Sequence, residues 1–161
     1  GFYNNKTVFI EQNAKSFVTG AADETGTIGK LMTEDNKPIE CEVSPNLYHF
    51  SGAVSVLAQE KNPFTSKMVS DSRFFVIGNV EPQERIVEQL EKYKYPQKVI
   101  DAYKQHGGIL PDYVGLYTVF GQVYEGIEVV NEISQLKHDA QTKLPTQKCV
   151  IEKIELSTYQ K

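Results

Sequence analysis

The chain of 161 residues offers few side chains at the spacings that nucleophilic or metal chemistry needs. Cys41 and Cys149 stand alone in apolar stretches, which predicts two buried free thiols and no disulfide framework. His49, His106 and His138 are also isolated, and no pair has the spacing of metal ligands. We therefore expect no bound metal and no cofactor.

Two other patterns match catalytic motifs only in part. The stretch from Gly26 to Lys30 has too few residues between its glycines for a phosphate-binding loop, and Leu31 stands where Ser or Thr is required. Glu40 and Glu42 share one face of a strand whose other residues are apolar. This alternation is typical of a solvated strand face, so we expect no acid–base pair at these glutamates. At Gly26 to Lys30 we expect an ordinary turn.

Composition and charge exclude several classes of protein. The net charge is −4 and the basic residues are scattered, so no nucleic-acid partner is expected. Charged residues make up 24% and apolar residues 40% of the chain, which is typical of a globular domain. Because no apolar run reaches about 18 residues, no membrane span is expected. The length predicts a single domain over residues 1–161.

Short apolar segments between turn-rich stretches predict the elements that must position any site. Strands are expected at 7–10, 16–19, 39–43, 53–57, 74–77, 117–123 and 149–156. Helices are expected after Pro82 and after Pro96, and a third helix carries an apolar stripe through 126–136. Short strands, long loops and few helices predict a mainly β barrel or sandwich.

Aromatic and glycine-rich stretches give the most specific signal in the chain. They are FVTGAAD at 17–23, SGAVSVLA at 51–58, SRFFV at 72–76 and YTVFGQV at 117–123. In this order they resemble the cyclophilin family of peptidyl-prolyl cis-trans isomerases. The stretch KYPQKVIDAYK at 94–104 resembles a helical insert in cyclophilins of Gram-positive bacteria, including surface lipoproteins. Order and spacing agree from about Gly1 to Leu156.

The resemblance implies a cyclophilin-like closed antiparallel β-barrel of eight strands with capping helices. In the family, two strands and a helix come before the segment that Gly1 opens. The single domain over 1–161 is therefore expected to lack them, which would leave strand edges exposed. The helical insert slightly favours a bacterial cell-surface location over a cytoplasmic one.

The resemblance also implies a peptide-binding site, whose positions fall on Phe17, Val18, Gly20, Leu57, Phe75, Tyr113 and Tyr117. Phe17 and Phe75 match the two phenylalanines of the family's proline pocket, while the other five positions depart from the family's usual residues. Ordinary barrel core is the alternative for both phenylalanines, because aromatic rings bury readily. Pocket and core are equally open interpretations for Tyr117.

The catalytic positions depart furthest from the family pattern. Gln12 falls where the family has its catalytic arginine, and Gly20 falls where a glutamine supports that arginine. A neutral amide donates a weaker hydrogen bond than a charged guanidinium. Arg73, which precedes Phe74, is the candidate replacement donor, and a surface ion pair is its alternative role. Asp112 replaces the pocket tryptophan, so cyclosporin binding is not expected.

Two functions from different classes follow from this pattern. The first is a cyclophilin-like peptidyl-prolyl isomerase with weak or lost activity on proline-containing peptides or unfolded proteins. The alternative is a non-catalytic proline-peptide or protein binding module of a bacterial surface protein, and a purely structural domain is a third interpretation. The phenylalanines fit both of the first two functions, whereas Gln12 and Gly20 favour binding.

Overall fold

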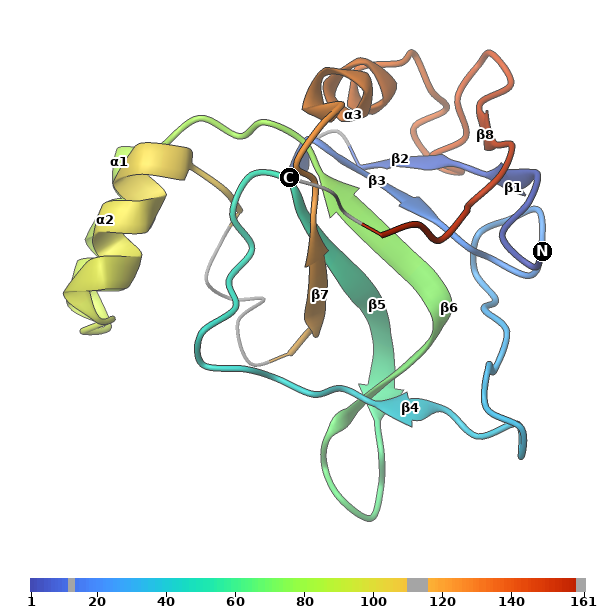
Figure 1. The fold of residues 1–161 in the computed structure, drawn as a ribbon, viewed down its shortest axis with the longest axis horizontal. Helices are drawn as coiled ribbons and strands as arrows, with labels where there is room; N and C mark the ends of the chain where they lie inside the picture. The colour runs from blue at the N-terminus through green and yellow to red at the C-terminus, as the bar shows by residue number, and fades with distance from the viewer. Residues whose placement is uncertain (12–13, 110–115, 159–161) are drawn as a thin grey trace.

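The computed structural model describes residues 1–11, 14–109 and 116–158, which form eight strands and three helices. In chain order these are β1 (Lys6–Thr7), β2 (Phe9–Glu11), β3 (Ser16–Thr19), β4 (Ile39–Glu40), β5 (Ala53–Lys61), β6 (Met68–Ile77), α1 (Glu84–Lys92), α2 (Gln97–His106), β7 (Val119–Gln122), α3 (Ile127–Ser134) and β8 (Val150–Ile151). Figure 1 shows their arrangement.

The main sheet is antiparallel, with the strand order β2-β3-β6-β5-β7 and with β4 paired to β6 beside this path. The short strands β1 and β8 form a second, two-stranded sheet. The prediction of a mainly β fold with helices is thus confirmed. Closure of the barrel is not confirmed, because the described strands leave β2 and β7 at the two ends of an open path.

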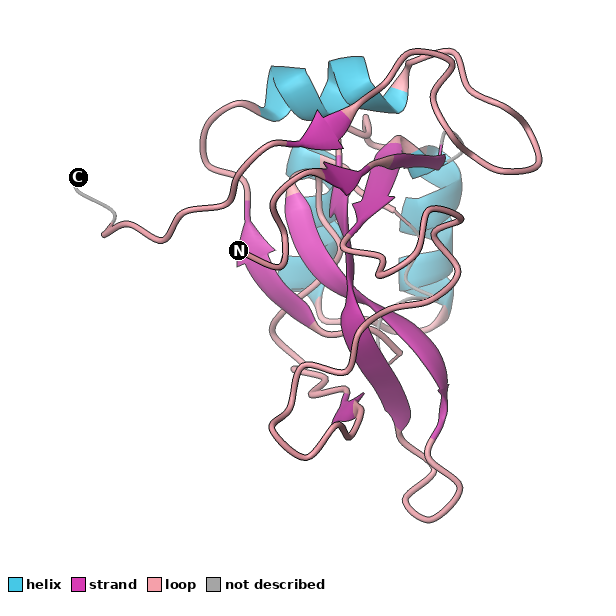
Figure 2. Cartoon of the chain, turned by 90° about the vertical axis from the view of Figure 1, so that its right-hand side faces the viewer, coloured by secondary structure: helices cyan, strands magenta, loops and turns pink. Residues whose placement is uncertain are grey.

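Strand alternation gives the main sheet two different faces. Phe17 of β3 lies opposite Val76 of β6, while the next residue, Val18, lies opposite Phe75. Because successive side chains point to opposite faces, the two pairs belong to different layers. The Phe17 face packs beneath α3, which lies across one end of the strands (Figure 2), and its buried cluster consists of Val8, Ile10, Phe17, Val76 and Val130.

The other face of the sheet carries a second buried cluster, formed by Ala53, Phe75, Ile77, Val80, Ile109 and Val119. Val18, Leu57 and Tyr117 are half-buried and pack against it. This cluster spans β5, β6, β7 and the loops beside them, and the candidate site described below lies above it.

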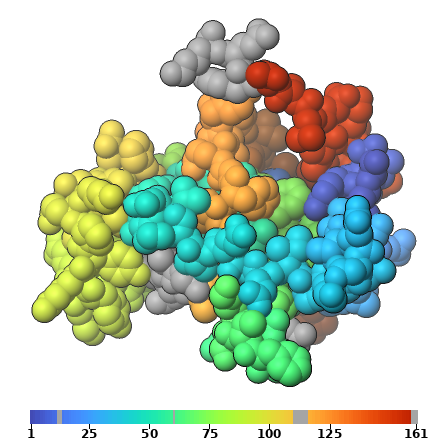
Figure 3. Space-filling view, turned by 60° about the horizontal axis from the view of Figure 1, so that its bottom comes forward, coloured from blue at the N-terminus to red at the C-terminus, as the bar shows by residue number. Residues whose placement is uncertain are grey.

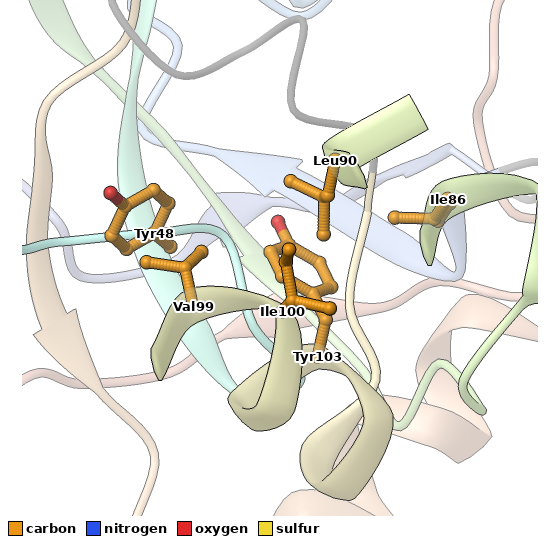
Figure 4. Close-up of a cluster of buried hydrophobic side chains, with 6 residues drawn as sticks. All are labelled: Tyr48, Ile86, Leu90, Val99, Ile100 and Tyr103. Carbon is orange, nitrogen blue, oxygen red and sulfur yellow. The ribbon is translucent and has the colours of Figure 1, made fainter. Parts of the chain in front are cut away.

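Helices α1 and α2 form a separate lobe at one side of the molecule (Figure 3). Their facing sides bury Ile86, Leu90, Val99, Ile100 and Tyr103 against Tyr48 (Figure 4). Gly107 ends α2 as predicted, with φ +65°, and a Cβ there would lie 1.8 Å from the carbonyl oxygen of Val80. Only glycine fits that position, because it has no Cβ and tolerates positive φ.

The remaining sequence predictions concern thiols, metals and membrane spans. Cys41 is buried and Cys149 is half-buried, and both are free thiols whose pKa burial raises. Within 1–11, 14–109 and 116–158, no three His, Cys, Asp or Glu side chains gather as a metal site would need. No helix in the same ranges is long and apolar enough to cross a membrane.

Candidate functional site

The candidate site is an open cavity of about 460 Å³ on the Phe75 face of the sheet. Strands β2, β3, β5 and β6 supply its floor, and the loops around 25–27 and 141–143 supply its walls. The lining residues are Phe9, Glu11, Ala14, Ser16, Val18, Thr25, Gly26, Thr27, Leu57, Phe75, Ile109, Tyr117, Gln141, Thr142 and Lys143. This volume is in the usual range for small-ligand pockets, and its floor is mostly apolar.

Phe75 is the central ring of the floor. Tyr117 meets it edge-on, with ring centroids 5.9 Å apart and planes at 90°. His49 stacks on Phe75 at 5.9 Å and 10°, and meets Tyr117 at 6.4 Å and 85°. These offset contacts between three rings fix the orientation of Phe75 more tightly than aliphatic packing alone would.

His49 supports this floor from the buried side, where it is 1% exposed. The Ser55 hydroxyl donates its proton to the carbonyl oxygen of Thr118 at 2.9 Å, so it accepts a hydrogen bond from Nε2 of His49 at 3.0 Å. Burial lowers the pKa of His49 to about 4, because the charged imidazolium would lose its hydration. At neutral pH a neutral imidazole therefore packs against Phe75.

Four of the sequence-predicted residues lie together in the cavity lining: Val18, Leu57, Phe75 and Tyr117. Phe17 does not join them, because it lies on the opposite face of β3 and packs beneath α3. The core alternative raised for the two phenylalanines therefore describes the surroundings of Phe17, while Phe75 both borders the cavity and belongs to a core cluster. Gln12 and Tyr113 lie outside the described residues.

Gly20 lies at the end of β3 and outside the cavity lining. Its φ is +84°, and a Cβ built there would lie 2.4 Å from the carbonyl oxygen of Ser72 and 3.1 Å from Cε1 of Tyr3. The carbonyl of Gly20 also accepts a hydrogen bond from the Ser72 hydroxyl at 2.6 Å. A side chain at this position requires a backbone shift, so a glutamine does not fit here as the chain is folded.

Arg73 is buried at 5% exposure and bonds to the loop that forms one wall of the cavity. Nη1 donates to the carbonyl oxygens of Gly26 at 3.0 Å and Thr27 at 2.6 Å. Nε and Nη2 donate to the carboxylate of Asp71, with Nη2 at 2.7 Å. One N–H on Nε, two on Nη1 and one on Nη2 are thus committed, four of the five.

Two roles were open for Arg73 from the sequence, a replacement donor and a member of a surface ion pair, and the structure bears on both. Its ion-pair partner exists, but the pair is buried and not on the surface, with side-chain exposures of 5% and 8%. Its guanidinium lies next to Gly26 and Thr27, which line the cavity, although Arg73 itself is not in the lining. A donor role toward a bound peptide stays a prediction.

The loop above Arg73 is also ordered from within. The Asp23 carboxylate accepts hydrogen bonds from the N–H of Ile28 at 2.9 Å, the N–H of Thr25 at 3.2 Å and both threonine hydroxyls of the loop. These bonds, led by the Thr25 hydroxyl and the Ile28 N–H, lower the pKa of the Asp23 carboxyl far below its usual range. This wall of the cavity is therefore a turn that its own side-chain hydrogen bonds stabilise.

Sequence reasoning missed the cavity residues that come from the loop between α3 and β8. Gln141, Thr142 and Lys143 line the cavity, although about 130 residues separate them from β2 and β3. Asp139 followed by polar residues indicates a turn, but no local pattern shows which part of the fold that turn meets. Lys143 is the one cation in the described lining and was not singled out from the sequence.

Comparisons with known proteins agree with the resemblance found in the sequence. A family model described as "Cyclophilin type peptidyl-prolyl cis-trans isomerase/CLD" matches residues 1–156. A Staphylococcus aureus (strain USA300) protein named "Putative peptidyl-prolyl cis-trans isomerase" is 32% identical over 97% of this chain and 74% of its own length. A protein of the same name from Staphylococcus saprophyticus is 29% identical over the same shares.

A similar solved structure is a cyclophilin type peptidyl-prolyl cis-trans isomerase of Cryptosporidium parvum, determined in the presence of the dipeptide Ala-Pro. The match has a TM-score of 0.66 and 20% identity, and it covers 99% of this chain and 78% of that one. A second structure of the same protein matches with 19% identity and the same TM-score and shares. At this identity the likeness concerns the fold.

Proposed function

The chain belongs to the cyclophilin-type peptidyl-prolyl cis-trans isomerase family, and we propose that its cavity binds proline-containing polypeptide segments and isomerises their prolyl bonds slowly. The observation that carries this proposal is the apolar floor of the open cavity, formed by Val18, Leu57, Phe75 and Tyr117. A prolyl ring is apolar and has no backbone N–H to satisfy, so an apolar floor suits it.

The reaction needs no nucleophile, metal or cofactor, because it is a rotation about one amide bond. That bond has partial double-bond character, and its rotation barrier is about 18–20 kcal/mol. In the twisted state the imide nitrogen regains a lone pair, and a donor aimed at this lone pair stabilises the transition state more than the planar ground state. The apolar floor holds the ring, and a donor at the rim lowers the barrier.

We propose a low rate because Gln12 offers a neutral donor where the resemblance implies arginine. Loss of a well-placed donor typically lowers turnover by about 10²–10³-fold. Arg73 is the weaker candidate as replacement, because four of its five N–H groups already bond to Asp71, Gly26 and Thr27. Its contacts support a role in holding the cavity wall.

A non-catalytic binding module is the second candidate function. The observation that favours it is Gly20, whose backbone has no room for the glutamine that would steady a donor. A prolyl peptide would then bind on the floor formed by Phe75 and Tyr117 without faster isomerisation. The presence of Ala-Pro in the Cryptosporidium parvum structure supports both candidates equally, because it concerns the ligand and not the rate.

One experiment separates the candidates. An Ala-Pro tetrapeptide is titrated into the protein, and its cis–trans exchange is measured by NMR. Saturable binding with catalysed exchange about 10²-fold below an intact cyclophilin is expected. Saturable binding without catalysed exchange would identify a binding module, and no binding would overturn the proposed function. Tyr117→Ala should weaken binding, while Tyr93→Ala, which removes a tyrosine that is 64% exposed outside the cavity, should not.

A further inference from the structure

Lys143 lies in a loop whose backbone is fixed beside the cavity. In the turn before it, the carboxylate of Asp139 accepts hydrogen bonds from the N–H of Gln141 at 3.0 Å and of Thr142 at 2.7 Å. The N–H of Lys143 donates to the carbonyl oxygen of Asp139 at 2.9 Å. These bonds set the path of the chain up to Lys143 without help from its side chain.

A second set of bonds attaches the loop to the main sheet. The N–H of Ile10, in β2, donates to the carbonyl oxygen of Lys143 at 2.8 Å. In Figure 1 the segment between α3 and β8 accordingly passes close to β2. Lys143 also has a φ of +62°, an unfavourable conformation for a residue with a side chain, which persists where surrounding structure imposes it. The Cα of Lys143 is thus held at the edge of the cavity.

Lys143 is half-buried and belongs to the cavity lining. Among residues 1–11, 14–109 and 116–158, none of the ion pairs or side-chain hydrogen bonds includes its ammonium group. Glu11 lines the same cavity but forms no ion pair with it in those ranges. In contrast, Arg73 has nearly all of its donors committed.

We infer that Lys143 is a catalytic residue of this cavity and that its ammonium donates a hydrogen bond to the imide nitrogen of a bound prolyl segment. The inference rests on the proposed function and names the donor that sustains the slow rate proposed above, in the absence of the family's arginine. An ammonium provides a charge-assisted hydrogen bond, about twice as strong as the bond from a neutral amide such as Gln12 offers. The step is a rotation, so no covalent bond forms or breaks and the ammonium keeps its proton.

An ordinary solvated lysine is the competing explanation, because most lysines lie at the surface with mobile side chains. Two observations separate Lys143 from that group. Its backbone is anchored on both sides, by Asp139 and by Ile10, and the residue is half-buried in the lining of a cavity whose floor is mostly apolar. Lys148 is the matched example of a solvated lysine, since it is exposed, lies outside the cavity lining and follows the same loop.

The test compares Lys143→Met, Lys143→Arg and Lys148→Met with the unchanged protein. Catalysed cis–trans exchange and the dissociation constant of an Ala-Pro tetrapeptide are measured for each, after chemical denaturation has shown equal stability. Lys143→Met should lower the catalysed exchange rate about 10²-fold, the usual loss for a removed transition-state donor, with peptide affinity within about threefold of the unchanged protein. Lys143→Arg should recover most of the rate, because guanidinium is also a charged donor. Lys148→Met should match the unchanged protein.

The outcomes separate this inference from the proposed function. If the unchanged protein catalyses exchange and Lys143→Met does so equally well, the inference is overturned and the proposed function stands. If Lys143→Arg is as slow as Lys143→Met, charge donation at this position is also overturned. If the unchanged protein binds peptide without catalysis, both the isomerase proposal and the catalytic role of Lys143 fail, and the binding module stands.

Discussion

Phe17 and Phe75 lie on opposite faces of the β3–β6 pair and are almost equally buried, but their surroundings differ. Phe17, on one face, is 5% exposed, and Phe75, on the other, is 6% exposed. Beyond the ring of Phe17 lie α3 and a closed apolar cluster, whereas the ring of Phe75 borders an open cavity. Burial alone therefore does not separate a core residue from a residue that lines a site. The two kinds of residue differ in what lies beyond the ring, which is packed side chains for Phe17 and an open cavity for Phe75.

The polar residues show the same contrast. On the Phe75 face, the Asp71–Arg73 pair and the Asp23 turn fix one wall, and the bonds between Ile10 and the Lys143 loop fix another. The Phe17 face is held mainly by apolar packing against α3. Because the cavity itself is not filled by side chains, hydrogen bonds and an ion pair around its rim add to the apolar packing of the cluster beneath it.

The largest effect is expected on the closed face. Phe17→Ala should lower the free energy of unfolding by about 4 kcal/mol, because it leaves a cavity that α3 and the neighbouring strands cannot fill. Peptide affinity of the folded variant should stay unchanged. Urea denaturation and a peptide titration measure the two quantities, with Phe64→Ala, a ring that is 95% exposed, as control. A small stability loss combined with weakened affinity would show that Phe17 serves the site.

Removal of Arg73 tests the wall of the open face. Arg73→Met should cost about 3–4 kcal/mol, because the Asp71 carboxylate stays buried without its partner. Arg73→Met with Asp71→Leu should recover part of this loss. The control is Lys37→Met, which breaks an exposed pair with Asp35 and should leave the free energy of unfolding nearly unchanged. If Arg73→Met abolished catalysed exchange at unchanged stability, Arg73 would be a donor and not a support of the wall.

Acid titration tests how far water is excluded from His49, which lies beneath Phe75. The pKa of His49 is about 4 in the folded protein and about 6.5 when unfolded, so the unfolded chain binds more protons between these values. The free energy of unfolding is therefore highest above pH 6.5, where His49 is neutral in both states. It falls as the pH drops toward 4, by up to about 3 kcal/mol. His49→Gln should flatten this part of the stability profile. His106→Gln, at an exposed histidine, is the control, and an equal flattening there would contradict the assignment.

The smallest stability effect is expected at Phe75. Phe75→Ala should cost about 2 kcal/mol, less than the usual 3–5 kcal/mol for a closed core, because truncation enlarges a cavity that is already open. Peptide affinity should fall about tenfold, the equivalent of about 1.4 kcal/mol. Denaturation and peptide titration again measure both. A loss above about 4 kcal/mol with unchanged affinity would place Phe75 in the same category as Phe17.

Sequence alone determined the family, the mainly β class and most of the elements. Apolar alternation and proline or glycine punctuation are local signals, so they located β3, α2 and the stop at Gly107 well. They predicted too short a range for β6, which was expected at 74–77 and runs over Met68–Ile77. The missing part, 68–73, is mostly polar, and its Ser70 is buried where it pairs with Ile39 of β4, a contact that no local pattern shows.

Tertiary structure decided which residues share the site. Adjacent residues such as Phe17 and Val18 look alike in sequence, but strand alternation directs them to opposite faces, and only the position of α3 shows which face is closed. Lys143 reached the cavity through a hydrogen bond to Ile10, across more than 130 residues. Periodicity describes how a segment is built, whereas the cavity depends on which distant segments meet. That choice belongs to packing and long-range hydrogen bonds, which the folded chain alone supplies.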